Sequence, residues 1–100
     1  MTEPIDIAIS RKLRPLMPKF LAVRSEELAK MKAALAAGDI ASLERHGHTL
    51  YGTASSYGFS RLGEIGKGIE AAAQAGEATA LARLVAELED HLARARIRYV

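Results

Sequence analysis

The chain contains three histidines, and His48 has the neighbours best suited to chemistry. Apolar residues at spacings of three and four predict a helix that ends at Gly58, and His48 lies one position off its buried stripe. Its ring is therefore expected at the edge of the core, facing water. Gly52 follows four residues later on the same ridge and clears space beside the ring. A fixed, accessible histidine beside such a gap is a candidate nucleophile towards a phosphoryl group.

Spacing alone leaves alternatives open for these residues. A helical glycine costs about 1 kcal/mol relative to alanine, so the presence of Gly52 inside a helix calls for an explanation. It either lets something large approach His48 or lets a neighbouring helix pack closely. On the same evidence, His48 is also compatible with a partly buried helix histidine that has no task. We expect His46 on the outer face of the same helix and His91 as an ordinary exposed residue.

Other chemistries find less support in the sequence. There is no cysteine, and therefore no disulfide, thiolate nucleophile or thiolate zinc site, and no local spacing sets up a Ser-His-acid triad. His46 and His48 are two residues apart, which in a helix turns them about 200° from one another. They cannot share an ion there, so we expect no metal. The chain has no nucleotide loop or kinase motif, and no second catalytic group can be placed near His48, so we expect neither a cofactor nor an enzyme with turnover of its own.

Composition narrows the class of partner and the location. The net charge is only +2, from 14 basic and 12 acidic residues, without the concentrated stripe that nucleic-acid binding requires. The first residues lack the pattern of a signal peptide, and no stretch approaches the roughly 20 apolar residues of a membrane span. We expect a soluble cytoplasmic protein that binds neither nucleic acid nor membrane.

Helix start and stop signals divide the 100 residues into one all-α domain. Residues 1–8 are expected to form a loose arm and residues 10–16 a short helical turn. Long helices follow at about 18–37, with Gly38 ending the first, then 39–57, 60–75 and 79–99, with Asp39 and Ser60 as N-caps. The short connections between them force antiparallel neighbours. The predicted fold is an up-down-up-down four-helix bundle with a short N-terminal helix. Four helices are enough to enclose a core, so we expect a monomer.

The apolar periodicity of each helix also predicts the core. The inward positions are expected at Leu21, Leu28, Met31 and Leu35, with Phe20 and Val23 beside them; at Ile40, Leu43, Gly47, Leu50, Ala54 and Tyr57; at Leu62, Ile65, Ile69 and Ala72; and at Leu81, Leu84, Val85, Leu88, Leu92 and Ala95.

Residues 48–59, HTLYGTASSYGF, resemble the signature of the histidine phosphotransfer (HPt) domains of two-component phosphorelays. That pattern is a histidine, any residue, Leu, usually Lys, Gly, small residues, and a Gly that ends the helix. Residues 62–70 are similar to the family's following helix, and residues 18–21 and 34–39 to its first long helix. The resemblance covers about residues 5–99. It implies that His48 is the phosphoacceptor, that Gly52 makes room for a receiver domain, and that the fold is a helical bundle.

One position departs from the family pattern, because Tyr51 stands where the family usually has lysine. A lysine there would neutralise part of the phosphoryl charge, which is about −1.5 to −2 on phosphorylated hydroxyl side chains. In an antiparallel pair turning near residues 58–59, residue 48 lies level with about residue 69. Lys67 and Glu70 flank that level. Our hypothesis is that Lys67 supplies the missing charge and Glu70 accepts a hydrogen bond from His48; the alternative is that both belong to a solvated helix face.

Two functions follow from the resemblance. The first is a phosphocarrier that relays a phosphoryl group between receiver-domain aspartates, with Mg²⁺ supplied by the receiver and a hybrid histidine kinase as a further partner. Docking is then expected near Tyr51, at Glu44, Arg45, Ser55 and Ser56. The second is a helical docking module that binds a receiver or kinase without transfer, which the loss of lysine at Tyr51 favours.

Overall fold

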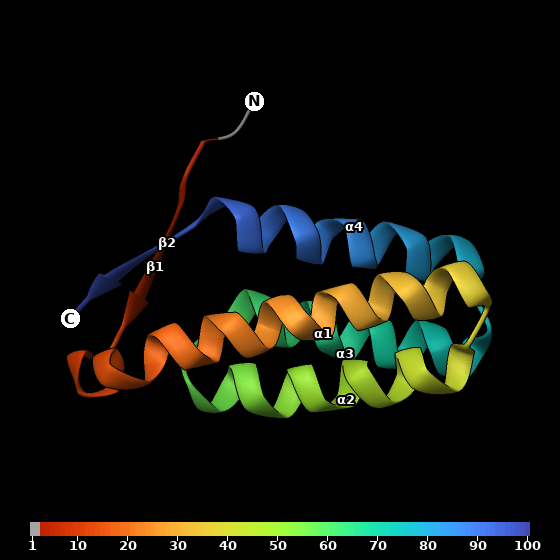
Figure 1. Cartoon of the computed structure of the whole chain (residues 1–100), viewed down its shortest axis with the longest axis horizontal. Coiled ribbons are helices and arrows are strands. Elements are labelled where there is room, and N and C mark those ends of the chain that lie inside the picture. Colours follow the sequence, from red (N-terminus) through yellow and green to blue (C-terminus); the bar gives the residue numbers. More distant parts are fainter. Residues whose placement is uncertain (1–2) are drawn as a thin grey trace.

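Four antiparallel helices form the body of the molecule, and the computed structural model describes residues 3–100 (Figure 1). Its elements are β1 (Ile5–Ile9), the 3₁₀ helix η1 (Arg11–Leu16), α1 (Met17–Ala37), α2 (Ile40–Ser56), α3 (Ser60–Ala75), α4 (Ala78–Arg94) and β2 (Ala95–Tyr99). Each helix reverses the direction of the one before it. The predicted up-down-up-down bundle with a short N-terminal helix is therefore confirmed.

The helices end where the sequence supplies stop residues. Gly38 adopts φ 69° after α1, a left-handed conformation that suits glycine because it has no Cβ. The Asp39 carboxylate then accepts a hydrogen bond from the Ser42 backbone N–H at 3.2 Å and caps the start of α2. The predicted cap of α3 is wrong by one position, because Phe59 is the N-cap and Ser60 is the first helical residue.

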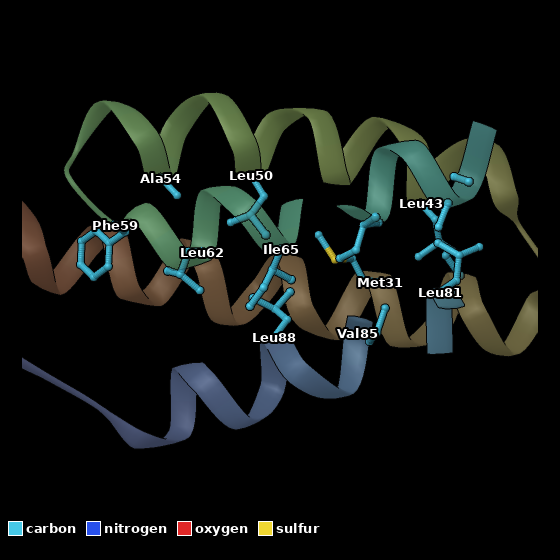
Figure 2. Packing of buried hydrophobic residues seen from close by; sticks show 14 of the residues in the cluster. Met31, Leu43, Leu50, Ala54, Phe59, Leu62, Ile65, Leu81, Val85 and Leu88 are labelled. Atoms are coloured by element: carbon cyan, nitrogen blue, oxygen red, sulfur yellow. The ribbon is translucent and has the colours of Figure 1, made fainter. Parts of the chain in front are cut away.

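The core lies along the axis of the bundle, where side chains of α2, α3 and α4 such as Leu50, Ile65 and Leu88 point into one interior (Figure 2). On α1 the buried stripe differs from the predicted one. Met31 is fully buried, whereas Leu21, Leu28 and Leu35 are only partly buried. The ring of Phe20 stacks on Tyr57 and Phe59, with centroids 4.9 and 4.7 Å away. These stacks turn the Phe20 face of α1 inward.

Two glycines bring the backbones of α2 and α3 into direct contact. A Cβ on Gly47 would lie 2.7 Å from the Glu70 backbone nitrogen, and one on Gly66 would lie 2.7 Å from the Tyr51 backbone nitrogen. Any side chain at either position would push the helices apart. The two glycines therefore fix the spacing of the helices that carry His48 and Glu70.

Both ends of the chain differ from the sequence prediction. Residues 5–9 form a strand instead of a loose arm, and they pair in parallel with residues 95–99, where we had predicted helix; residues 1–2 of that arm lie outside the described part. β-branched and aromatic side chains alternate with polar or small ones in both segments, which favours strands. The inward-facing Ile9 is buried, so the pair covers one end of the bundle.

Within residues 3–100, no helix has the length and apolar character that crossing a membrane requires.

Candidate functional site

His48 projects from the middle of α2, with 71% of its side chain exposed. Its Nδ1 lies 2.9 Å from Oε2 of Glu70 on α3, whose side chain is only 24% exposed. The structure thus contains the hydrogen bond that we expected between these two residues. A solvated histidine held by a more buried carboxylate is oriented while its other ring nitrogen stays accessible.

The partner atom determines the tautomer of His48. A carboxylate oxygen accepts hydrogen bonds and cannot donate them, so the proton of the neutral ring lies on Nδ1. Nε2 then carries the lone pair. This leaves the imidazole of His48 ready to act as a nucleophile through Nε2.

A row of contacts between α2 and α3 places this pair. Gln74 donates a hydrogen bond to Glu44 at 3.1 Å, one turn from the His48–Glu70 contact. In the other direction, the Lys67 ammonium lies over the ring of Tyr51, 5.6 Å from its centroid. Sequence reasoning did not single out Gln74, although the same antiparallel alignment that pairs His48 with Glu70 sets it level with Glu44.

Gly52 lies in open space on the ridge of His48. Apart from its chain neighbours and the backbone of its own helix turns, a Cβ built on it would meet no atom of the described residues within 4 Å. The packing interpretation of Gly52 therefore has no support, since no neighbouring helix approaches it. Nearby, the Ser56 hydroxyl donates a hydrogen bond to the Gly52 carbonyl at 2.8 Å, which ties this side chain to its own helix.

A shallow depression of about 520 Å³ surrounds the histidine, and its lining includes His48, Glu44, Arg45, Thr49 and Glu70. Arg45 donates a hydrogen bond to the Ser42 hydroxyl at 3.1 Å and remains exposed. This surface is open and shallow, unlike the deep pocket of a small-molecule enzyme.

On the C-terminal side of His48 along α2, Tyr51, Ser55 and Ser56 are exposed. The Ser55 side chain lies against Gly63 of α3, where a Cβ would come within 2.5 Å of its hydroxyl oxygen. The residues that we expected at a docking surface therefore flank His48 along α2 in both directions.

The other two histidines lie elsewhere, and both expectations about their exposure are wrong. His46 is half-buried in a groove between α1 and α2 that Glu27 and Lys30 also line. His91 is only 7% exposed and lines a shallow groove together with residues of β1. Burial and the nearby Arg61 lower its pKa. Within residues 3–100, no three acidic or histidine side chains gather as a metal would require.

Comparison with known families identifies the domain that contains this site. The model of the Hpt domain matches residues 16–97, which include α1 to α4 and the His48 site. The match confirms the resemblance drawn from the histidine signature, and β1 lies outside it. No curated protein and no solved structure matches the chain.

Proposed function

Because the chain belongs to the Hpt domain family, whose members are phosphocarriers without turnover in phosphorelay signalling, we propose that His48 is the residue that carries the phosphoryl group. The observation that supports this most strongly is the hydrogen bond from His48 Nδ1 to Glu70 on a ring that is otherwise exposed. The open space over Gly52, one turn away, supports the same assignment.

The transfer step follows from the tautomer. Nε2 of His48 attacks the phosphorus of an aspartyl phosphate on a receiver domain. A P–N bond forms while the P–O bond to the aspartate breaks, and the aspartate leaves as a carboxylate with the electron pair. The proton on Nδ1 stays in place, so the phosphorylated ring is cationic and is stabilised by the Glu70 carboxylate. The reverse of this step delivers the group to a second receiver.

Lys67 is proposed to supply the positive charge that Tyr51 lacks. Its ammonium already lies over the Tyr51 ring, on the α3 side of the His48 ridge. A cation there can compensate the phosphoryl oxygens as they arrive. The tyrosine contributes a surface that holds the lysine in place through a cation–π contact.

Hpt domains interact with receiver domains of phosphorelays. In this chain we place the contact along α2, from Glu44 and Arg45 through His48 to Ser55 and Ser56. The encounter is transient and belongs to the small class of interfaces, below about 1,200 Å². The receiver contributes the aspartate and Mg²⁺. A hybrid histidine kinase is a further partner, and we propose that this protein acts in the cytoplasm.

Phosphoryl transfer from a panel of labelled phospho-receivers of the same organism tests the proposal. Wild type should acquire acid-labile, base-stable label, and His48→Gln should acquire none. His46→Gln is the matched control, because it removes a histidine two residues away on the same helix and should leave transfer intact. Label on His48→Gln would refute the assignment. Binding of a receiver without any transfer to the wild type would instead support the docking module that Tyr51 in place of lysine favours.

A further inference from the structure

The parallel pair β1–β2 leaves two strand edges without a partner. In the described part of the chain, residues 3–100, the sheet has only these two strands. A two-stranded sheet is marginal alone in water, and unpaired edges are templates for a further strand. A shallow groove of about 250 Å³, lined by residues of β1, by residues 58–61 and by His91, lies between this strand and the start of α3.

The hydrogen-bond pattern shows which backbone groups face the edge of β1. Val100 N donates to Ile9 O at 2.9 Å, and Arg11 N donates to Val100 O at 3.0 Å. In a parallel ladder the residues of one strand alternate in direction, so Ile5, Ile7 and Ile9 bond to β2. The N–H and C=O groups of Asp6 and Ala8 therefore point away from β2. Within residues 3–100, neither residue has a backbone hydrogen bond outside the sheet.

These edge groups can pair with a second copy of β1 in an antiparallel register centred on Ile7. With Ile7 on a two-fold axis, Asp6 lies opposite Ala8 of the second copy, and the pair exchanges two hydrogen bonds on each side of the axis. The isoleucines then continue one apolar face. A shift that places Asp6 on the axis brings two carboxylates together and sets Pro4, which has no N–H, opposite Ala8.

The edge of β2 has the opposite character. Its free groups belong to Ala95, Ile97 and Tyr99, by the same alternation. Antiparallel pairing of two β2 strands about Ile97 would set Arg96 directly opposite Arg98 of the second copy, twice. Like charges facing each other across strands are destabilising, so these arginines disfavour pairing of β2 with a second β2.

We propose that this chain forms a two-fold dimer through antiparallel pairing of β1 with β1 of a second copy, giving a four-stranded sheet. The sequence alone led us to expect a monomer, because four helices close a core; the strand edge lies outside that core. Gly58, which the side chain of Ile9 contacts, is ten residues from His48, or about 15 Å along the helix direction. The dimer therefore leaves both His48 rings accessible, and it does not depend on their function.

Proline at position 8 tests the interface without breaking β1–β2. Ala8→Pro removes an edge N–H that β2 does not use, and proline is tolerated on edge strands at such positions. Sedimentation of the wild type should give a dimer mass as concentration rises into the millimolar range. Because two of the four inter-chain hydrogen bonds disappear, Ala8→Pro should weaken dimerisation at least about tenfold, with unchanged helical circular dichroism. Ala8→Thr keeps the N–H and should dimerise as the wild type does.

A cross-link tests the register. The chain has no cysteine, so Ile7→Cys introduces a single thiol on the proposed axis. Facing residues of a non-hydrogen-bonded pair have Cα atoms about 4.5 Å apart, within the range of a disulfide. Under mild oxidation Ile7→Cys should give a linked dimer, whereas Asp6→Cys, which faces Ala8, should give much less. A monomer at all concentrations, a dimer unaffected by Ala8→Pro, or equal cross-linking of the two cysteine variants would each overturn the proposal.

Discussion

Replacing Gly52 with alanine separates the stability of α2 from access to His48. The added Cβ meets no atom of another helix within 4 Å, so the folded state gains a methyl group without a clash between helices. Alanine is better than glycine in a helix interior by about 0.8–1.0 kcal/mol. For a domain of this size, about 1 kcal/mol corresponds to a rise in Tm of about 4–8 °C. Gly52→Ala should therefore be more stable than the wild type.

The same methyl group should impair phosphoryl transfer. It stands on the ridge of His48, four residues along α2, in the space that a receiver must enter. A misplacement of the reacting groups by about 1 Å can cost about 10²-fold in rate. We expect Gly52→Ala to lower the transfer rate from a phospho-receiver at least about tenfold, although His48 and Glu70 are unchanged.

Thermal unfolding and single-turnover transfer, measured on the same preparations, check both parts. Gly68→Ala is the matched control, because its Cβ would lie 3.4 Å from the flexible Leu84 side chain of α4, away from His48. It also gains helix propensity and should transfer at the wild-type rate. Loss of stability in Gly52→Ala would show that Gly52 is a packing residue. Transfer at the wild-type rate in Gly52→Ala would refute the idea that the gap admits the partner.

Three further predictions concern the surroundings of the site. Gly66→Ala should lower the free energy of unfolding by about 1–3 kcal/mol in denaturant titrations, because its Cβ would lie 2.7 Å from backbone on α2; an unchanged midpoint contradicts this. Lys67→Ala should shorten the lifetime of phosphorylated His48, and Lys30→Ala should not. Equal lifetimes in the two variants would contradict the proposal that Lys67 compensates the phosphoryl charge. His91 has a folded-state pKa below its usual 6.5, so its contribution to stability is complete above that pH and is lost as the pH falls; the unfolding free energy of wild type should fall more steeply below pH 6.5 than that of His91→Gln.

The sequence predicted the helices well because their ends are local signals. Gly38 and Asp39 determine the turn between α1 and α2 through residues that are adjacent in the chain. The His48–Glu70 contact could also be predicted from the sequence, because a short turn fixes how two antiparallel helices align. The contacts between residues 44 and 74 and between 48 and 70 put residue 48 level with residue 70, one position from the expected level of 69.

The strands and the burial of His91 could not be predicted in the same way. Ile5, Ile7 and Ile9 alternate as a strand does, but five such residues have no stable structure without a partner. Their partner lies ninety positions away, in a segment that follows α4 without a break and whose arginines also suit the end of a helix. His91 lines one groove with residues of β1 and with residues 58–61, neighbours from other elements that the spacing within α4 does not reveal.

The position of the positive charge shows how far the site depends on packing between helices. In the usual family pattern the lysine belongs to the same helix as the histidine, so α2 alone would fix their spacing. Here Lys67 and Glu70 both come from α3, and Gly66, beside Lys67, brings the α3 backbone onto Tyr51. Any change that separates α2 from α3 should therefore disturb the tautomer of His48 and the compensating charge together. Gly66→Ala should thus reduce transfer by more than Glu70→Gln and Lys67→Ala each do alone, even where it remains fully folded.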